Sequence, residues 1–144
     1  MLDGTFFALA DTGSPVTLVS LKAIPKHLHD SITPSNLLLA GANGSRLKIV
    51  GTLSLDISFM PYPKTYSIDV VIADDICETV LLGSDFLTKH SCVLDFSQLT
   101  LGVGDDLVPL LKVTSPPKNN RTFDVKITKT VTIPARTVAN NVRL

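Results

Sequence analysis

The chain has 144 residues, of which 44% are hydrophobic and 18% charged, which argues against a disordered protein and favours one domain with its own core. Thirteen basic and thirteen acidic residues give a formal net charge of zero, so the charge offers no reason to expect nucleic acid or an anionic membrane as a partner. No apolar run approaches the roughly 18 to 20 residues that span a bilayer, and the first residues lack the pattern of a signal peptide.

The two cysteines, Cys77 and Cys92, are too few for a dense disulfide framework. We expect ordinary buried thiols in a reducing compartment, and therefore a cytoplasmic protein, with a single bridge left open as the alternative. The three histidines and Cys92 have spacings that fit no common zinc site. Neither a metal nor a cofactor is predicted.

Short runs of Val, Ile, Leu, Thr and Phe, cut by Gly, Pro, Asn and Asp, predict an all-β domain. The first extended segments are expected at residues 5–10, 16–21, 37–40 and 46–58. Asn43-Gly44 lies between the last two and predicts a hairpin, because both residues tolerate positive φ. Every second residue from 47 to 59 is apolar or Gly, which is the period of a strand with one buried face.

Further strands are expected at residues 66–73, 80–82, 92–96 and 99–103, the last two as a hairpin. The one helix expected is short and runs to His90, with Ser84 or Asp85 as its N-cap. Asp105-Asp106 is expected in a solvated turn. We assign residues 1–114 to this domain, 115–121 to a polar linker that contains proline, and 122–144 to an extended C-terminal arm.

The segment with the clearest chemical content is Asp11-Thr12-Gly13-Ser14, which directly follows an apolar strand. Apolar flanks hold the backbone of such a turn rigid, and Gly13 allows a close backbone approach that a Cβ would block. The Thr12 hydroxyl suits a hydrogen bond across a site, and the Ser14 hydroxyl suits a hydrogen bond to the Asp11 carboxylate. Taken alone the tripeptide is common, and a structural turn aspartate explains it equally well.

A second segment changes that balance, namely Val80-Leu81-Leu82-Gly83-Ser84-Asp85-Phe86-Leu87, with Leu94-Asp95-Phe96 after it. Together with Asp-Thr-Gly and the Asn-Gly hairpin, it resembles the retropepsin family of aspartic proteases. Within that family it looks most like the proteases of long-terminal-repeat retrotransposons. The resemblance covers roughly residues 2–111 and implies a closed, retropepsin-like all-β barrel with a flap hairpin and one short helix.

The resemblance also implies an aspartic endopeptidase whose catalytic motif is Asp11, Thr12 and Gly13. This chemistry needs two carboxylates that share one proton, so that one activates a water and the other donates to the developing oxyanion. The sequence holds one Asp-Thr-Gly and no second copy of it. A second chain is therefore expected to supply the other carboxylate, in a homodimer whose two-fold axis passes beside Asp11. The expected substrate is an extended peptide, such as the retrotransposon's own polyprotein.

By the same likeness, residues 38–50 would form the flap, with Ala42, Asn43 and Gly44 near its tip, and Leu82 would line a subsite. Gly83 would let the loop behind the catalytic turn pack closely. Apolar pockets would favour cleavage between large apolar residues. Ser14 stands where retroviral members often have Ala, and its hydrogen bond to the carboxylate would favour an acidic activity optimum.

Two alternatives accompany this interpretation. A serine nucleophile at Ser14 would need a nearby His base, for which the sequence gives no signal. A non-catalytic or domesticated retropepsin fold could instead serve as a dimerisation or peptide-binding module. Only ten residues precede Asp11, so the first strand of the family's fold, which contributes to its dimer sheet, is expected to be absent or shortened.

Overall fold

The computed structural model describes residues 6–111, which form an all-β domain as predicted. The strands are β1 (Ala8–Ala10), β2 (Leu18–Ser20), β3 (Ile49–Ser58), β4 (Thr65–Ala73), β5 (Val80–Leu82), β6 (Val93–Asp95), β7 (Thr100–Val103) and β8 (Asp106–Pro109). The helices are the 3₁₀ turns η1 (Leu21–Ala23) and η2 (Lys26–Ser31) and the α-helix α1 (Ser84–Lys89). None of the helices within this range could cross a membrane, being too short or too polar. The predicted linker (115–121) and C-terminal arm (122–144) lie outside the described residues, and the domain boundaries stay predictions.

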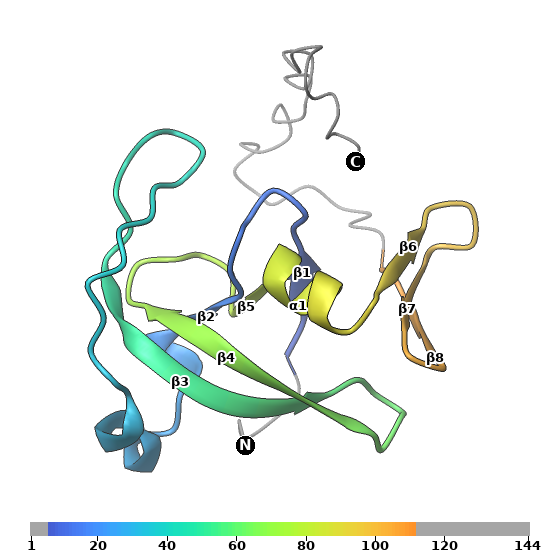
Figure 1. Cartoon of the computed structure of the whole chain (residues 1–144), viewed down its shortest axis with the longest axis horizontal. Helices are drawn as coiled ribbons and strands as arrows, with labels where there is room; N and C mark the ends of the chain where they lie inside the picture. Colours follow the sequence, from blue (N-terminus) through green and yellow to red (C-terminus); the bar gives the residue numbers. More distant parts are fainter. Residues whose placement is uncertain (1–5, 112–144) are drawn as a thin grey trace. The chain divides into compact units, whose positions relative to one another are not determined.

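The larger sheet has five strands in the order β1-β5-β2-β4-β3 (Figure 1). β1 is parallel to β5 and β2 is parallel to β4, whereas the β2–β5 and β3–β4 pairs are antiparallel. Because β1 and β5 run in the same direction, their C-terminal ends lie at the same edge of the sheet. The residues that follow them, Asp11 and Gly83, therefore leave the sheet from neighbouring positions.

The smaller sheet is antiparallel and contains β6, β7 and β8. Its first hairpin confirms the strands predicted at residues 92–96 and 99–103. β8 is missing from the prediction, because Asp105-Asp106 was expected in a turn. The turn consists of Gly104 and Asp105 instead, so Asp106 already pairs with Val103 as the first residue of a strand.

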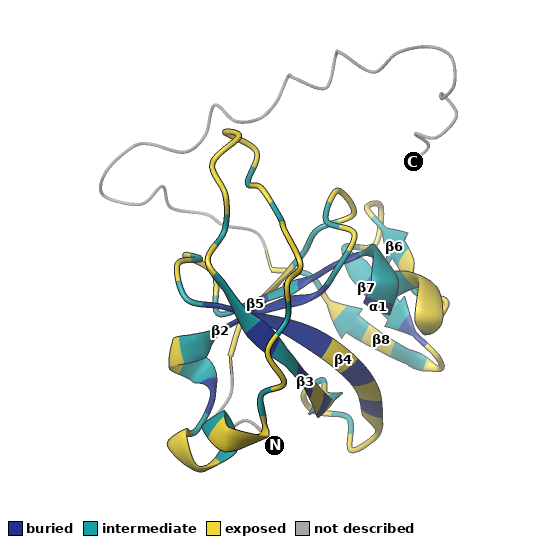
Figure 2. Ribbon diagram, turned by 60° about the vertical axis from the view of Figure 1, so that its left-hand side comes forward, coloured by how far each residue is buried: buried dark blue, intermediate teal, exposed yellow. Residues whose placement is uncertain are grey.

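The core is formed mainly by β2, β4 and β5, with buried side chains added from β3, β7 and α1 (Figure 2). β4 alternates between exposed and buried residues and is then buried continuously from Val70 to Ala73, as predicted for a strand near the centre of a sheet. The Tyr66 hydroxyl donates to the carbonyl oxygen of Val103 at 2.8 Å, which joins the two sheets. These contacts fix the strand ends that carry the site.

The α-helix α1 depends on one buried side chain. Phe86 is fully buried, and its ring packs edge-on against those of Phe59 and Tyr66, with centroids 6.0 and 6.4 Å apart. A helix of six residues has little stability of its own, so this aromatic packing holds it in place. The predicted capping by Ser84 or Asp85 is wrong, because Gly83 is the N-cap and no side chain caps the helix.

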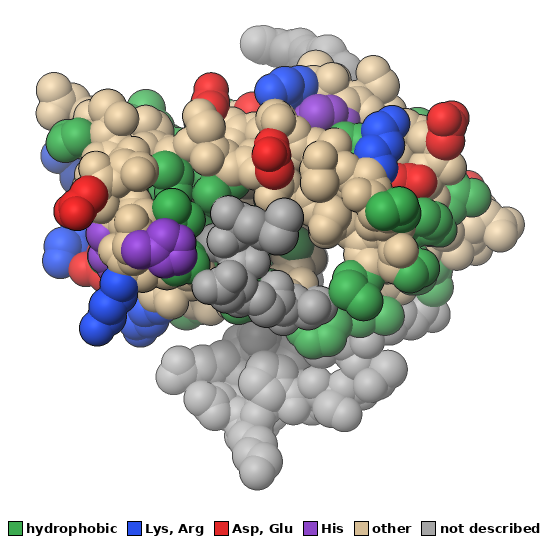
Figure 3. Space-filling view, turned by 90° about the horizontal axis from the view of Figure 1, so that it is seen from below, with side chains coloured by type: hydrophobic (Ala, Val, Ile, Leu, Met, Phe, Trp, Pro, Cys, Tyr) green, Lys and Arg blue, Asp and Glu red, His purple; other side chains and the backbone are tan. Residues whose placement is uncertain are grey.

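The charged side chains show no segregation on the face seen in Figure 3, where Lys and Arg are interspersed with Asp and Glu. This distribution agrees with the net charge of zero. A mixed surface produces no long-range field of one sign.

Candidate active site

Asp11 lies directly after β1 and is held by the end of β5. Its backbone N–H donates to the carbonyl oxygen of Leu82 at 2.8 Å, which continues the parallel β1–β5 ladder by one residue. The N–H of Gly13 donates to Asp11 Oδ1 at 2.8 Å. The carboxylate is half-buried. It is thus oriented by backbone groups and still open to solvent, as a group that must handle a water and a proton requires.

The turn that carries Asp11 rests on a network behind it. Thr17 is buried, with 1% of its surface exposed. Its hydroxyl donates to Asp85 Oδ1 at 2.7 Å and accepts from the N–H of Gly83 at 3.0 Å. Its backbone N–H donates to Asp85 Oδ2 at 3.0 Å. Asp85 therefore ties the Asp-Thr-Gly turn to the start of α1, a structural role in place of the N-cap role predicted for it.

Gly83 is required by the same packing. A Cβ at this position would overlap the carbonyl oxygen of Val16 and lie 2.8 Å from that of Ser14. The Ser84 N–H also donates to the Ser14 carbonyl oxygen at 2.7 Å, so the two segments are in direct backbone contact. This confirms the prediction that Gly83 allows close packing behind the Asp-Thr-Gly turn. We refer to residues 11–18 and 81–86 together as the floor of the site.

A cleft of about 610 Å³ lies beside Asp11. Its floor includes Asp11, Gly13, Ser14 and Leu81. Its other walls are the flap, defined here as residues 39–47, and the loop of residues 75–78 between β4 and β5. The cleft therefore combines the candidate catalytic carboxylate with a hairpin and a loop that could hold an extended peptide.

The flap is a hairpin closed by few hydrogen bonds. The Leu47 N–H donates to the Leu39 carbonyl oxygen, and the Gly41 N–H to that of Ser45, both at 2.8 Å. At the tip Gly44 has a φ of +84°, a conformation that favours glycine. Leu39 and Leu47 pack against the buried cluster around Leu18 and anchor the base. The tip residues are exposed, as Figure 2 shows.

The flap base is also tied to the β4–β5 loop by charge. Lys48 Nζ lies 2.8 Å from Asp74 Oδ2, and this hydrogen-bonded pair raises the pKa of Lys48 and lowers the pKa of Asp74. The Lys48 N–H also donates to Asp75 Oδ1 at 3.0 Å. Two walls of the cleft are thus linked at their base, while the flap tip is not restrained by this pair.

Most of the predicted site residues lie together. Asp11, Gly13, Ser14, Ala42 and Asn43 all line the cleft. Thr12 is exposed in the turn, and within residues 6–111 its hydroxyl has no hydrogen-bond partner. Gly44 shapes the flap turn without lining the cleft. The residues predicted from the local sequence therefore lie mostly at one cleft, and their catalytic and substrate-binding roles stay predictions.

Two predictions about side-chain direction are wrong. Leu82 is buried and lies outside the cleft lining, whereas Leu81 lines the cleft, because neighbouring side chains of a strand point to opposite faces. The Ser14 hydroxyl donates to the Val16 carbonyl oxygen at 2.7 Å and so does not donate to the Asp11 carboxylate. The reason given for an acidic activity optimum is thereby removed.

The sequence interpretation missed the charged lining of the cleft. Arg46 on the flap, and Asp75 and Glu78 on the β4–β5 loop, all line it. Only their position beside the predicted flap and the Leu-Leu-Gly strand could have drawn attention to them.

Cys77 also lines the cleft and is exposed, which corrects the expectation of a buried thiol. Cys92 is half-buried, and burial raises the pKa of its thiol.

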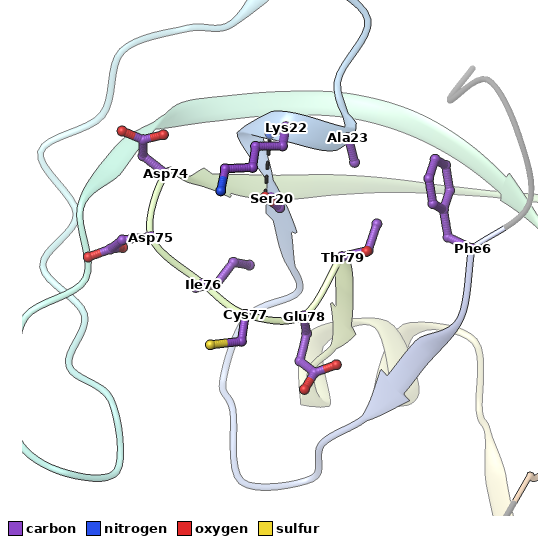
Figure 4. Close-up of a pocket in the computed structure, with 10 residues that line it drawn as sticks. All are labelled: Phe6, Ser20, Lys22, Ala23, Asp74, Asp75, Ile76, Cys77, Glu78 and Thr79. Atoms are coloured by element: carbon purple, nitrogen blue, oxygen red, sulfur yellow. Dashed lines mark hydrogen bonds between the residues drawn. The ribbon is translucent and has the colours of Figure 1, made fainter. Parts of the chain in front are cut away.

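A second hollow of about 460 Å³ lies on the other side of the β4–β5 loop (Figure 4). It is lined by residues of that loop, by Ser20 and Lys22, and by Phe6. In Figure 4 the Cys77 and Glu78 side chains point away from those of Ile76 and Thr79. Asp11 does not line this hollow, so we place the candidate chemistry in the larger cleft.

Within residues 6–111 no group of three or more His, Cys, Asp or Glu side chains is arranged to hold a metal ion. His29 and His90 each contact another group of the chain. His29 Nε2 lies 2.9 Å from the Ile24 carbonyl oxygen, and the His90 ring packs against Phe86 with centroids 4.6 Å apart. The candidate chemistry described above rests on the Asp11 carboxylate and the turn around it.

The comparison with solved structures agrees with this geometry. The chain is similar to the crystal structure of the retroviral protease-like domain of Ddi1 from Leishmania major, with a TM-score of 0.63 and 15% sequence identity, over 83% of this chain and 92% of that one. The fold is retropepsin-like. No protein-family model matches the chain. At this identity the likeness concerns the fold, and it confirms the predicted all-β, retropepsin-like class.

Proposed function

We propose that the chain is one subunit of an aspartic endopeptidase, in which two copies each contribute Asp11 to a single active site. The observation that carries this proposal is the position of Asp11. It stands at the end of a strand, oriented by the Gly13 N–H, and it faces a cleft covered by a flap. The retropepsin-like fold supports the same assignment.

The need for a second copy follows from the chemistry. Peptide hydrolysis by this route uses two carboxylates close enough to share a proton, and the sequence supplies one Asp-Thr-Gly. The exposed Thr12 hydroxyl, which has no partner within residues 6–111, is free to hydrogen-bond to the second copy. A two-fold axis beside the turn would bring two Asp11 and two Thr12 side chains together.

In the proposed reaction, the ionised Asp11 takes a proton from a water whose oxygen attacks the scissile carbonyl carbon. The neutral Asp11 of the other copy donates its proton to the carbonyl oxygen as the tetrahedral intermediate forms. The carboxyl that accepted the water proton then protonates the amide nitrogen, and the C–N bond breaks. The other carboxylate takes a proton back from one hydroxyl of the intermediate, so the products are an amine and a carboxylic acid and both carboxyls return to their starting states. The two carboxylates thus mediate every proton transfer, and no covalent acyl-enzyme is formed.

For the biological substrate we propose a polyprotein, as the resemblance to retrotransposon proteases implies, processed in the cytoplasm. The apolar residues of the cleft, among them Leu39, Leu47 and Leu81, suit the side chains of an extended peptide. An extended segment between floor and flap would gain main-chain hydrogen bonds from both sides. These contacts would require no charge or modification on the peptide.

Cleavage of a peptide library over a series of protein concentrations tests the proposal. We expect activity that rises faster than linearly with protein concentration and that is lost in Asp11→Asn. The matched control is Asp30→Asn, which removes an exposed carboxylate in η2, away from the cleft. Peptide binding without cleavage at any concentration, unchanged in Asp11→Asn, would instead identify a non-catalytic binding module.

A further inference from the structure

The cleft carries opposite charges on two of its walls. Arg46 lies in the flap arm, directly after the tip, and Glu78 lies on the β4–β5 loop. Both side chains are exposed, and both line the cleft that contains Asp11. Glu78 borders the second hollow as well, and Figure 4 shows its side chain pointing away from those of Ile76 and Thr79. A peptide between flap and floor would therefore pass both charges.

Neither charge is neutralised within the described part of the chain. Within residues 6–111 a single ion pair is formed, between Lys48 and Asp74. Neither Arg46 nor Glu78 takes part in it. Asp75, the other acidic residue of the lining, already accepts the Lys48 N–H through Oδ1. Arg46 and Glu78 are therefore charged groups of the cleft whose side chains have no hydrogen-bond or ion-pair partner within residues 6–111, whereas Asp75 has one carboxylate oxygen engaged.

We propose that this cleft selects peptides by charge, with Glu78 binding a Lys or Arg side chain and Arg46 binding an acidic side chain. The inference rests on the proposed function and deepens it by naming the substrate class. It also changes the expectation of cleavage between large apolar residues, because apolar contacts from Leu39, Leu47 and Leu81 would be combined with two charge contacts. A guanidinium on the flap suits a planar carboxylate, which it can bind through two N–H groups.

The symmetry of the proposed dimer makes the inference more specific. Each copy would supply its own Arg46 and Glu78 to the shared cleft. A peptide crossing the two-fold axis would therefore meet the same pair of charges on each side of the scissile bond. The preference for basic and acidic residues should accordingly appear at equivalent positions on both sides of the cleaved bond.

The first test compares cleavage profiles of the full chain with those of Glu78→Gln and Arg46→Gln, using extended peptides with Lys, Glu or Gln at each position in turn. We expect the wild-type chain to prefer Lys over Gln by about fivefold at one symmetric pair of positions, the size of a partly exposed ion pair. Glu78→Gln should abolish the preference for Lys, and Arg46→Gln should abolish a similar preference for Glu over Gln at another pair of peptide positions.

The controls are Asp30→Asn and Lys26→Gln, which change exposed charges in η2 and should leave the cleavage profile unchanged. Cleavage with identical profiles in all variants would overturn the inference.

A binding measurement separates failure of this inference from failure of the proposed function. The same peptides, carrying a fluorophore, are titrated with Asp11→Asn and with Asp11→Asn combined with Glu78→Gln, at about pH 6 so that exposed carboxylates are ionised. Charge selection is supported if Asp11→Asn binds Lys peptides more tightly than Gln peptides and the double variant does not. This result counts even where the wild-type chain cleaves nothing. Equal binding by both proteins, or no binding of any peptide, contradicts charge selection whatever the activity.

Discussion

The floor and the flap of the candidate site are built in opposite ways. The floor joins two segments far apart in sequence through buried groups, among them Thr17, Gly83 and Phe86. The flap is local in sequence, exposed at its tip, and closed by hydrogen bonds between its own residues. A rigid floor keeps the carboxylate in position, whereas a weakly held hairpin can open to admit a peptide. Substitutions in the floor should therefore affect the whole domain, and substitutions in the flap should act locally.

The largest effect is expected for Gly83→Ala. The new methyl group would overlap the Val16 carbonyl oxygen, and backbone cannot move aside as a flexible side chain does. We expect a loss of about 3 kcal/mol in the free energy of unfolding, at the upper end of the usual cost of overpacking. Urea unfolding followed by circular dichroism measures it. A loss under about 1 kcal/mol, within the range of ordinary substitutions, would show that the floor is less tightly packed than described.

A somewhat smaller effect is expected for Thr17→Val, which keeps the shape of the side chain and removes its hydroxyl. The buried Gly83 N–H would lose its acceptor, and Asp85 Oδ1 would lose one donor while still accepting from the Phe86 N–H. A buried donor left without a partner costs about 1–3 kcal/mol, and we expect about 2 kcal/mol of stability to be lost. Thr65→Val, at an exposed strand position, is the matched control and should change stability by less than about 0.5 kcal/mol.

On the flap side, Gly44→Ala should cost about 1 kcal/mol, the lower end of the cost of a side chain in the left-handed region. A Cβ at Gly44 would meet no atom within 4 Å, so the cost comes from the positive φ alone. Gly44→Asn should cost less than Gly44→Ala, because Asn tolerates this conformation better. Thermal unfolding of both variants checks the order. A loss from Gly44→Ala as large as that from Gly83→Ala would contradict the contrast between flap and floor.

The two cysteines give a comparison without any mutation. Cys77, on the cleft wall, is exposed, whereas Cys92 is half-buried and burial raises the pKa of its thiol. A raised pKa leaves less thiolate at a given pH, so Cys92 should be alkylated more slowly at neutral pH and should gain rate only as the pH rises. Iodoacetamide labelling followed by mass spectrometry measures both rates. Equal rates in the folded protein would contradict the burial of Cys92, and equal rates in denaturant are the expected control.

The sequence predicted the parts of this fold that local patterns determine. The Asp-Thr-Gly turn, the strand at 80–82 and the Asn-Gly hairpin are where the patterns placed them. The bond between Thr17 and Asp85 spans 68 residues of sequence, so no local pattern could reveal it, and Asp85 was given a capping role instead. Leu82 was assigned to the cleft by the family likeness, and the alternation of a three-residue strand is too short to show which face is buried.

The same limit applies to the groups that distinguish this cleft from others. Arg46 and Glu78 are ordinary exposed charges in the sequence, and only the folded chain brings them to one cleft. The sequence predicted the neighbouring Asp11 carboxylate as acceptor for the Ser14 hydroxyl, which donates to the Val16 carbonyl oxygen instead. Residue identity limits which hydrogen bonds are possible, and the tertiary backbone selects among them.

The most direct test of the central claim is a mixing experiment with the wild-type chain and Asp11→Asn. At constant wild-type concentration, added Asp11→Asn should form mixed dimers with a single competent carboxylate, and peptide cleavage should fall steadily as the mutant share rises. Asp30→Asn added in the same amounts should not reduce it. Cleavage that is proportional to wild-type protein and unaffected by Asp11→Asn would contradict an active site shared between two copies.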